Sequence, residues 1–422
     1  MPKLLFLNRV FGSEAEPTGM LLHQLAEDLA FENEVTIICA RSSSWRRGIW
    51  PFIKRKPEGA VKVIRTFAPN ISKRRGLLRY LDSFVYLGLA ACAAFSERAD
   101  VIIAETDPPL LGLVGVMLRF LWRCPFVYYC QDVYPDVGVA SGALKNRAII
   151  WFVRRCNRLA YDRADAIVVL APDMAGLLQR KGVPAGKIAI IPNWIDCDKV
   201  KPRSAPTDPE KPFLAMYAGN VGWTQNLECV LYAAHLMRSD RRVRFIIAGD
   251  GARKIHLQAR AKHLQLSNVA FADRVEASKL SERLADGDLH LIPLGAGVAG
   301  CMVPSKIYAI LAAGKPFIAM MEKHAEVARI AAEAEVGFVV APGDAAALAR
   351  TIGECIERRE LLDAMGLRAR ALAETTYDRS IVTRRFATFL AAVLRGEPLS
   401  ERDAIDRTPA IEIGESVAIA GK

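Results

Sequence analysis

The chain begins with MPKLLFLNRVFGSEAEPTGMLLHQLAEDLAFENEVTIICA (residues 1–40), and this stretch indicates its fold class. Short apolar runs at residues 3–7 and 34–39 flank a longer segment, 20–30, in which apolar residues recur at helical spacing. A strand, a helix and a second strand in this order are typical of a βαβ unit in a parallel sheet. The opening stretch therefore predicts an α/β protein.

The same alternation continues along the chain, with a break in the middle. Residues 192–212 are rich in proline and polar breakers, which favours a domain boundary there. A chain of 422 residues with 52% hydrophobic and 24% charged residues can fill two cores. We therefore expect two Rossmann-like domains. The further expected strands are 101–104, 126–130 and 166–170, then 214–217, 243–248, 269–271, 289–293, 316–319 and 337–340.

Cysteine usage and hydropathy indicate a compartment. The nine cysteines are scattered singly, without a Cys-x-x-Cys pair, and no signal-peptide pattern opens the chain. The apolar runs at 84–95 and 110–118 are well short of the roughly 20 residues that a membrane-spanning helix needs. The sequence predicts a cytoplasmic protein with reduced cysteines, no membrane span and no metal site.

A basic segment lies within the first domain. Between Arg41 and Arg79 there are twelve basic residues and one acid, interleaved with aromatic side chains. This composition suits an anionic membrane surface; the alternative is a solvated loop face. We expect no nucleic-acid partner, because no recognisable binding module accompanies the charge. The residues expected to face the membrane are Trp45, Arg46, Arg47, Lys54, Arg55, Lys56, Lys73, Arg74 and Arg75.

Glycine turns between strands and helices are candidate phosphate sites. Gly19 precedes the first expected helix, where backbone N–H groups can approach a phosphate; the alternative is a purely conformational glycine. The turn after the first expected strand, residues 8–13, does not contain Gly-x-Gly-x-x-Gly, which counts against a nicotinamide or flavin enzyme. The corners YAGNVG (217–222) and AGDGARK (248–254) repeat the pattern with basic residues that suit a diphosphate or are merely solvated. Their candidate residues are Gly219, Asn220, Gly249, Gly251, Arg253 and Lys254.

Two further stretches offer polar side chains. YYCQDVYPD (128–136) ends an expected strand, where Gln131 and Asp132 would orient sugar hydroxyls or cap the next turn. VPSKIYAILAAGKP (303–316) follows the small-residue loop GAGVAG (295–300). Pro304 and Ser305 are expected to cap the start of a helix, and Lys306 would then point at the cleft or into solvent.

Together these stretches resemble retaining family 4 glycosyltransferases of bacterial polysaccharide assembly, especially the branch similar to colanic-acid fucosyltransferase and O-antigen enzymes. The matching stretches keep their order over roughly residues 3–392. The resemblance implies a GT-B fold whose two domains have parallel sheets that face a central cleft. It divides the chain into an acceptor-side domain (1–195), a linker (196–212), a nucleotide-sugar-binding domain (213–378), a crossover helix (379–395) and a loosely ordered tail (396–422).

The resemblance also implies roles at the site. Gly19 amides, Asn220 and the helix start at Ser305 and Lys306 would hold the diphosphate of a UDP- or GDP-linked donor, and Gln131 or Asp132 would contact the sugar. No metal and no cofactor besides this co-substrate are implied. Relatives often carry a glutamate that binds the donor ribose where this chain has Ala309, so the donor nucleotide stays open.

The sequence therefore predicts a retaining transferase of hexosyl, deoxyhexosyl or N-acetylhexosaminyl groups. Its acceptor would be a polyprenyl-diphosphate-linked saccharide in exopolysaccharide or O-antigen biosynthesis, met at the inner face of the cytoplasmic membrane. The alternatives are a sugar-nucleotide 2-epimerase, which shares the fold, and a non-catalytic GT-B scaffold of a polysaccharide assembly complex. The sequence leaves the linkage and the oligomeric state open.

Overall fold

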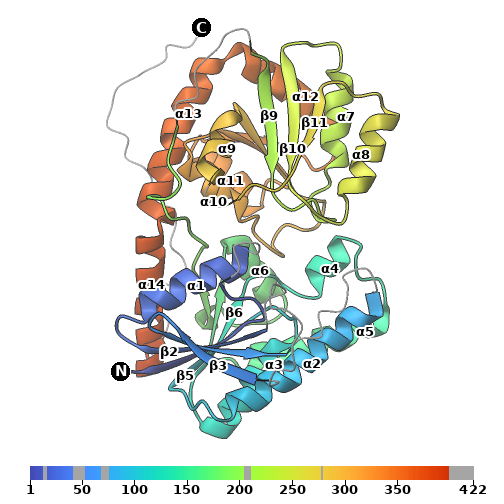
Figure 1. The fold of residues 1–422 in the computed structure, drawn as a ribbon. Helices are drawn as coiled ribbons and strands as arrows, with labels where there is room; N and C mark the ends of the chain where they lie inside the picture. The colour runs from blue at the N-terminus through green and yellow to red at the C-terminus, as the bar shows by residue number, and fades with distance from the viewer. Residues whose placement is uncertain (13–16, 41–52, 68–75, 204–210, 277–278, 399–422) are drawn as a thin grey trace.

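The computed structural model describes all of the chain except residues 13–16, 41–52, 68–75, 204–210, 277–278 and 399–422. Its strands form two sheets, one from each half of the chain, and the two halves lie one above the other in Figure 1. Helices cover both sheets, and all strand pairs but one are parallel. The predicted α/β class with parallel sheets is confirmed.

The N-terminal sheet has eight strands in the order β3-β4-β2-β1-β5-β6-β7-β8. Figure 1 shows α1 on one side of this sheet and α2, α3 and α5 on the other. The central strands are buried along their whole length, as expected for a parallel sheet that is covered on both faces. The strands are β1 (Lys3–Leu7), β2 (Glu34–Ala40), β3 (Ile53–Glu58), β4 (Val61–Thr66), β5 (Val101–Glu105), β6 (Phe126–Cys130), β7 (Ala166–Val169) and β8 (Ile188–Ile190). The helices are α1 (Pro17–Leu29), α2 (Gly76–Ala94), α3 (Leu111–Trp122), α4 (Asp136–Ala140), α5 (Arg147–Arg163) and α6 (Pro172–Arg180).

The hairpin of β3 and β4 was not predicted. β3 is the edge strand, pairs antiparallel with β4, and carries the sequence IKRKPE, which has no apolar alternation. An edge strand needs no buried face, and charged side chains protect it from pairing with other chains. Part of the basic segment is therefore an edge strand, whereas the sequence indicated only a loop or a membrane-facing segment.

The C-terminal sheet has six parallel strands in the order β11-β10-β9-β12-β13-β14. All six lie within about one residue of the predicted ranges, because each carries a short apolar run bounded by turn residues. The strands are β9 (Phe213–Ala218), β10 (Val243–Ala248), β11 (Val269–Ala272), β12 (Leu289–Pro293), β13 (Phe317–Met320) and β14 (Gly337–Val340). The helices are α7 (Glu228–Leu236), α8 (Lys254–His263), α9 (Leu280–Asp286), α10 (Lys306–Ala312), α11 (Glu326–Glu333), α12 (Ala345–Glu357) and α13 (Arg359–Leu372).

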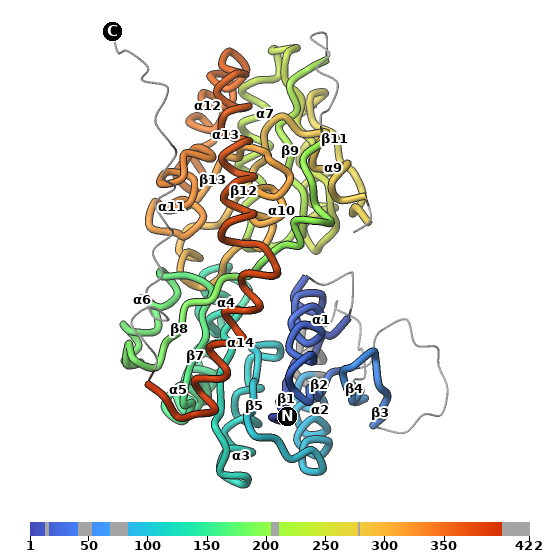
Figure 2. The backbone as a smooth tube through the Cα atoms, turned by 90° about the vertical axis from the view of Figure 1, so that its left-hand side faces the viewer, coloured from blue at the N-terminus to red at the C-terminus, as the bar shows by residue number. Residues whose placement is uncertain are grey.

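The last helix, α14 (Arg379–Arg395), returns to the N-terminal half, and Figure 2 shows it descending beside that half. Its first residue, Arg379, donates to the carboxylate of Asp28 on α1 at 2.6 Å and 2.9 Å. Further along, the rings of Phe386 and Tyr129 lie 5.2 Å apart, which docks α14 against β6. Charge pairing and aromatic packing thus tie the end of the chain to the first domain.

Candidate functional site

The end of β6 meets the loop that precedes α10. Asp132 forms an isolated antiparallel bridge with Met302, and the N–H of Val133 donates to the carbonyl of Cys301 at 2.8 Å. Cys301 and Met302 lie five and four residues before Lys306 in the sequence. The structure therefore joins the stretch 128–136 to the loop directly before the stretch 303–316, which the sequence singled out on the other domain.

Lys306 lies in an unusual environment. Its Nζ is buried, has no hydrogen-bond partner among the described residues, and lies 3.7 Å from the centre of the Tyr217 ring. A Cβ placed on Gly219 would lie 3.1 Å from this Nζ, so any other residue there would crowd the amine, and its φ of +144° is also strained for a residue with a side chain. Burial lowers the pKa of Lys306 to about 7. An amine that is desolvated and unpaired is poised to receive an anion.

The two glycine corners interlock beside this amine. The N–H of Val221 donates to the carbonyl of Asp250 at 2.8 Å, and the N–H of Arg253 returns to the carbonyl of Val221 at 3.0 Å. Gly249 has φ +146° and Gly251 has φ +154°, conformations that residues with side chains rarely adopt. Backbone from the other corner fills the space where their Cβ atoms would be. Gly219, Asn220, Gly249, Gly251 and Lys306 thus belong to one cluster.

Arg253 and Lys254, both expected at a diphosphate, are already paired in the structure. The Arg253 guanidinium forms an ion pair with Glu228 and lies 4.3 Å from the centre of the Trp223 ring. The Lys254 ammonium lies 2.9 Å from the Asp273 carboxylate. Either cation would have to exchange a partner before it met a phosphate, whereas Lys306 would not.

The start of α10 differs in one detail from the sequence prediction. Lys306 is its first residue, and Pro304 and Ser305 precede it as predicted. Ser305 is at the cap position, but its side chain makes no capping hydrogen bond, so the expectation of a capped start is wrong. A capping serine needs extended backbone, and Ser305 instead has φ −58° and ψ −19°. Ala309 is half-buried and packs on the core in the next turn.

Gln131 and Asp132 differ in how freely their side chains could meet a substrate. The Gln131 amide exchanges hydrogen bonds with the buried Asn193, the shorter at 3.1 Å, and is therefore held in place. The N–H of Asp132 donates to Thr106 Oγ1 at 3.2 Å, and its carboxyl has no hydrogen-bond partner among the described residues. Burial, and then the nearby Asp107, raise the pKa of Asp132 to about 7.

Gly19 is explained by packing. It is buried in the first turn of α1, where an added Cβ would lie 2.6 Å from Val10 Cγ1. Its carbonyl accepts the N–H of Gly12 at 3.1 Å, which closes the turn against the helix. No contact described for this part of the chain joins Gly19 to the Lys306 cluster, so its expected role at a phosphate stays a prediction.

The candidate membrane residues are only partly described. Trp45, Arg46, Arg47, Lys73, Arg74 and Arg75 lie outside the described residues. Lys54, Arg55 and Lys56 lie on the edge strand β3, and Arg55 shares the carboxylate of Glu97 with Lys62. In the part of the chain that the structure describes, no helix is long and apolar enough to cross a bilayer. Nor do three or more His, Cys, Asp or Glu side chains gather there as a potential metal site.

Sequence reasoning missed a contact between the domains. The carboxylate of Asp173, at the start of α6, accepts the N–H groups of Gly300 at 3.1 Å and of Glu326 at 3.2 Å. These donors belong to the small-residue loop and to α11 of the C-terminal half. An acid in the first turn of a helix is common, so its sequence alone gave no signal of this contact.

Comparisons with known proteins identify a family domain in each half of the chain. Residues 18–194 match a model described as "Glycosyl transferase 4-like domain", and residues 212–358 match one described as "Glycosyl transferases group 1". A protein of Pseudomonas aeruginosa named as probable glycosyltransferase WbjE is 30% identical over 331 residues, 76% of this chain and 81% of that protein. A protein of Escherichia coli (strain K12) named as "Putative colanic acid biosynthesis glycosyl transferase WcaI" is 26% identical over 407 residues, 91% of this chain and 98% of that protein.

A solved structure shares the fold at low sequence identity. The crystal structure of Anabaena HepE in complex with UDP and glucose superposes with a TM-score of 0.68 at 18% identity. The alignment covers 93% of this chain and 100% of HepE. At this identity the likeness concerns the fold, which therefore spans both halves of the chain.

Proposed function

Because the chain belongs to the glycosyltransferases that combine a 4-like domain with a group 1 domain, we propose that it moves a sugar from a nucleotide-sugar donor to a lipid-linked saccharide, with retention of configuration. The protein is a sugar-transferring enzyme with the GT-B fold, as the resemblance predicted. The donor, the acceptor and the stereochemical course are our proposals.

One observation carries the donor proposal, namely the buried, unpaired amine of Lys306 beside the first of the two interlocked glycine corners. The amine sits at the first residue of α10 against the backbone of Gly219, where it could meet a diphosphate without breaking an ion pair. A cation at the departing phosphate stabilises the charge that develops in the transition state. HepE, which shares the fold, has been solved with UDP and glucose, and this supports a nucleotide-sugar donor. We propose no cofactor besides the donor.

The proposed reaction takes place on one face of the transferred sugar. The acceptor hydroxyl oxygen forms a bond to the anomeric carbon as the bond from that carbon to the diphosphate oxygen breaks. The departing phosphate oxygen takes the hydroxyl proton, so no separate base is required. Lys306 would stabilise the phosphate, and the backbone bridge between Asp132 and Met302 would hold the Asp132 carboxyl near the sugar.

The proposal for the acceptor also concerns the biosynthetic process and the membrane at which the reaction takes place. Similarity to WcaI, which is named for colanic acid biosynthesis, supports a role in bacterial surface polysaccharide assembly. We propose a polyprenyl-diphosphate-linked saccharide as acceptor. Such a lipid would confine the reaction to the inner face of the cytoplasmic membrane, with the protein bound peripherally.

A donor screen tests the function. Purified protein is incubated with UDP-, GDP- and ADP-linked hexoses, deoxyhexoses and N-acetylhexosamines, and release of the nucleoside diphosphate is measured with and without membrane extract. We expect one donor to turn over, with faster release when the extract supplies acceptor lipid. Release of a 2-epimerised free sugar would favour the epimerase instead. No binding and no turnover of any donor would refute the proposal.

We also expect nucleotide binding to be coupled to protonation of the Lys306 amine. Its pKa of about 7 leaves most of the free amine neutral near pH 8. A bound diphosphate favours the charged form and raises this pKa, so binding of UDP or GDP near pH 8 should take up about one proton. The affinity should accordingly fall as the pH rises above 7. Calorimetric titrations in buffers of different ionisation enthalpy measure the uptake.

The matched control is the variant Lys306→Met. Its binding enthalpy should not depend on the buffer, because the titrating amine is gone. If the wild-type enthalpy is also independent of the buffer near pH 8, Lys306 does not meet the diphosphate.

A further inference from the structure

Helix α5 exposes large apolar side chains on the N-terminal half. Trp151 is 61% exposed, and Phe152 and Leu159 are exposed further along the same helix. The neighbouring helix α3 adds Phe120, which is 79% exposed, and Leu121. We call these five residues the α3/α5 face. Large apolar side chains left exposed on two helices that contact each other indicate a site of interaction.

Basic residues accompany this face. Residues 145–163 contain six basic residues and one acid, Asp162, which is paired with Arg158. Arg147, Arg154 and Arg155 are exposed, and no ion pair is described for any of them. The guanidinium of Arg155 lies 5.8 Å from the centre of the Trp151 ring, so the positive charge and the aromatic ring lie on the same side of the helix. The side chains on this helix face therefore present apolar area within a positive rim.

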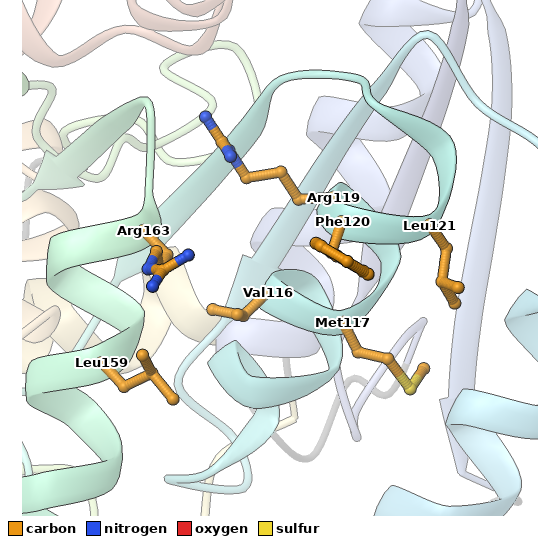
Figure 3. A pocket seen from close by; sticks show the side chains of 7 residues that line it. All are labelled: Val116, Met117, Arg119, Phe120, Leu121, Leu159 and Arg163. Carbon is orange, nitrogen blue, oxygen red and sulfur yellow. The ribbon is translucent and has the colours of Figure 1, made fainter.

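The face continues into a groove between α3 and α5. Figure 3 shows Leu159 and Val116 turned toward each other across the groove, with the guanidinium groups of Arg119 and Arg163 near one end. The groove lining is mainly aliphatic and aromatic, and Arg119 is paired with Asp165. Acyl-chain carbons would find apolar contacts there, and a lipid phosphate would find Arg163.

We propose that the α3/α5 face docks on an anionic lipid bilayer, with its aromatic side chains at the headgroup boundary and Arg147, Arg154 and Arg155 on lipid phosphates. Trp and Phe beside arginine on an amphipathic helix are typical of interfacial binding. The inference deepens the proposed function and rests on its lipid-linked acceptor. It differs from the sequence prediction, which placed the membrane contact at residues 41–79.

Helix α5 is also connected to the site. Its buried Asn157 donates to the carbonyl of Tyr134 at 2.8 Å, within the segment that follows β6. Figure 1 shows α4 between α5 and the junction of the two halves. A bilayer at α5 would therefore lie on the same domain as the segment 131–136, which contains Asp132, the residue proposed to lie near the transferred sugar.

Vesicle co-sedimentation tests the face. The probes are vesicles of phosphatidylethanolamine with phosphatidylglycerol, and vesicles of phosphatidylcholine alone. The wild type should bind the anionic vesicles and bind the neutral vesicles at least about tenfold more weakly. The double variants Trp151→Ala/Phe152→Ala and Arg154→Gln/Arg155→Gln should each lose at least about tenfold in partitioning.

A matched control separates this face from the edge strand. Lys54→Gln/Lys56→Gln on β3 removes the same charge as the arginine pair and should cost less than about threefold. The proposal is overturned if the β3 variant loses binding while the α5 variants keep it. It is also overturned if the wild type binds no vesicle, or if the α5 changes alter the oligomeric state in light scattering instead.

Donor turnover distinguishes the two proposals. The α5 variants should keep donor hydrolysis and lose transfer to membrane-bound acceptor. Vesicle binding by a protein that turns over no donor would leave the docking face standing and refute the proposed function.

Discussion

Replacing Lys306 with methionine is expected to lower turnover of the proposed donor by about 100- to 1000-fold, the usual cost of removing one group that stabilises a leaving oxygen. The structure places this amine, unpaired and buried, beside the backbone of Gly219 and over the ring of Tyr217. Steady-state release of the nucleoside diphosphate at saturating donor measures the effect. The loss should appear mainly in kcat.

The same substitution should not harm the fold. A lysine whose folded-state pKa lies below its ordinary value binds protons less well when folded, so it disfavours folding at neutral pH. That cost is fully present below about pH 7 and disappears as the pH rises toward the ordinary pKa of lysine. Methionine fills a similar volume without the amine. We expect the melting temperature of Lys306→Met to equal or exceed that of the wild type.

The control for this prediction is Lys262→Met. Lys262 is exposed on α8 and takes no part in the cluster, so both turnover and stability should stay at wild-type values. A Lys306→Met protein that is folded and fully active would refute the assignment of Lys306. A loss of activity accompanied by unfolding would instead show that the amine is structural.

The glycine corners and the start of α10 could be located from sequence because their signals are local. A strand, a glycine turn and a helix follow each other within about ten residues, and such patterns persist whatever the rest of the fold does. The predictions that the structure changed depend instead on residues that are distant in the sequence. Nothing in the sequence near Arg253 shows that Glu228 and Trp223 occupy its guanidinium. The unpaired state of the Lys306 amine likewise depends on distant residues, because it results from burial of the amine against other elements of the fold.

The N-terminal half illustrates the same difference. The central strands were predictable from buried apolar runs, but the charged edge strand β3 has no such run. Composition drew attention to residues 41–79 as a membrane segment, because twelve basic residues lie close together in the chain. The α3/α5 face is assembled from two helices about thirty residues apart in the sequence. Only their packing places Phe120 beside Leu159.

Replacing Gly249 with alanine is expected to destabilise the C-terminal domain by at least about 3 kcal/mol, which puts it among the most damaging single substitutions. Its φ of +146° is strained for any residue with a side chain, and an added Cβ would collide with the carbonyl of Gly219. That carbonyl belongs to backbone and cannot rotate aside as a side chain would. Urea denaturation followed by circular dichroism, with each transition fitted separately, measures the loss.

Gly353→Ala supplies the opposite case. Gly353 lies inside α12, and no atom within 4 Å would meet its Cβ, so alanine should raise stability by about 0.5–1 kcal/mol through its better helix propensity. Any folded Gly249→Ala protein should still bind UDP or GDP poorly, since the collision would displace the Gly219 backbone that lies against Lys306. Wild-type stability and nucleotide affinity in Gly249→Ala would mean that the two corners do not form the interlocked site from which the donor proposal proceeds.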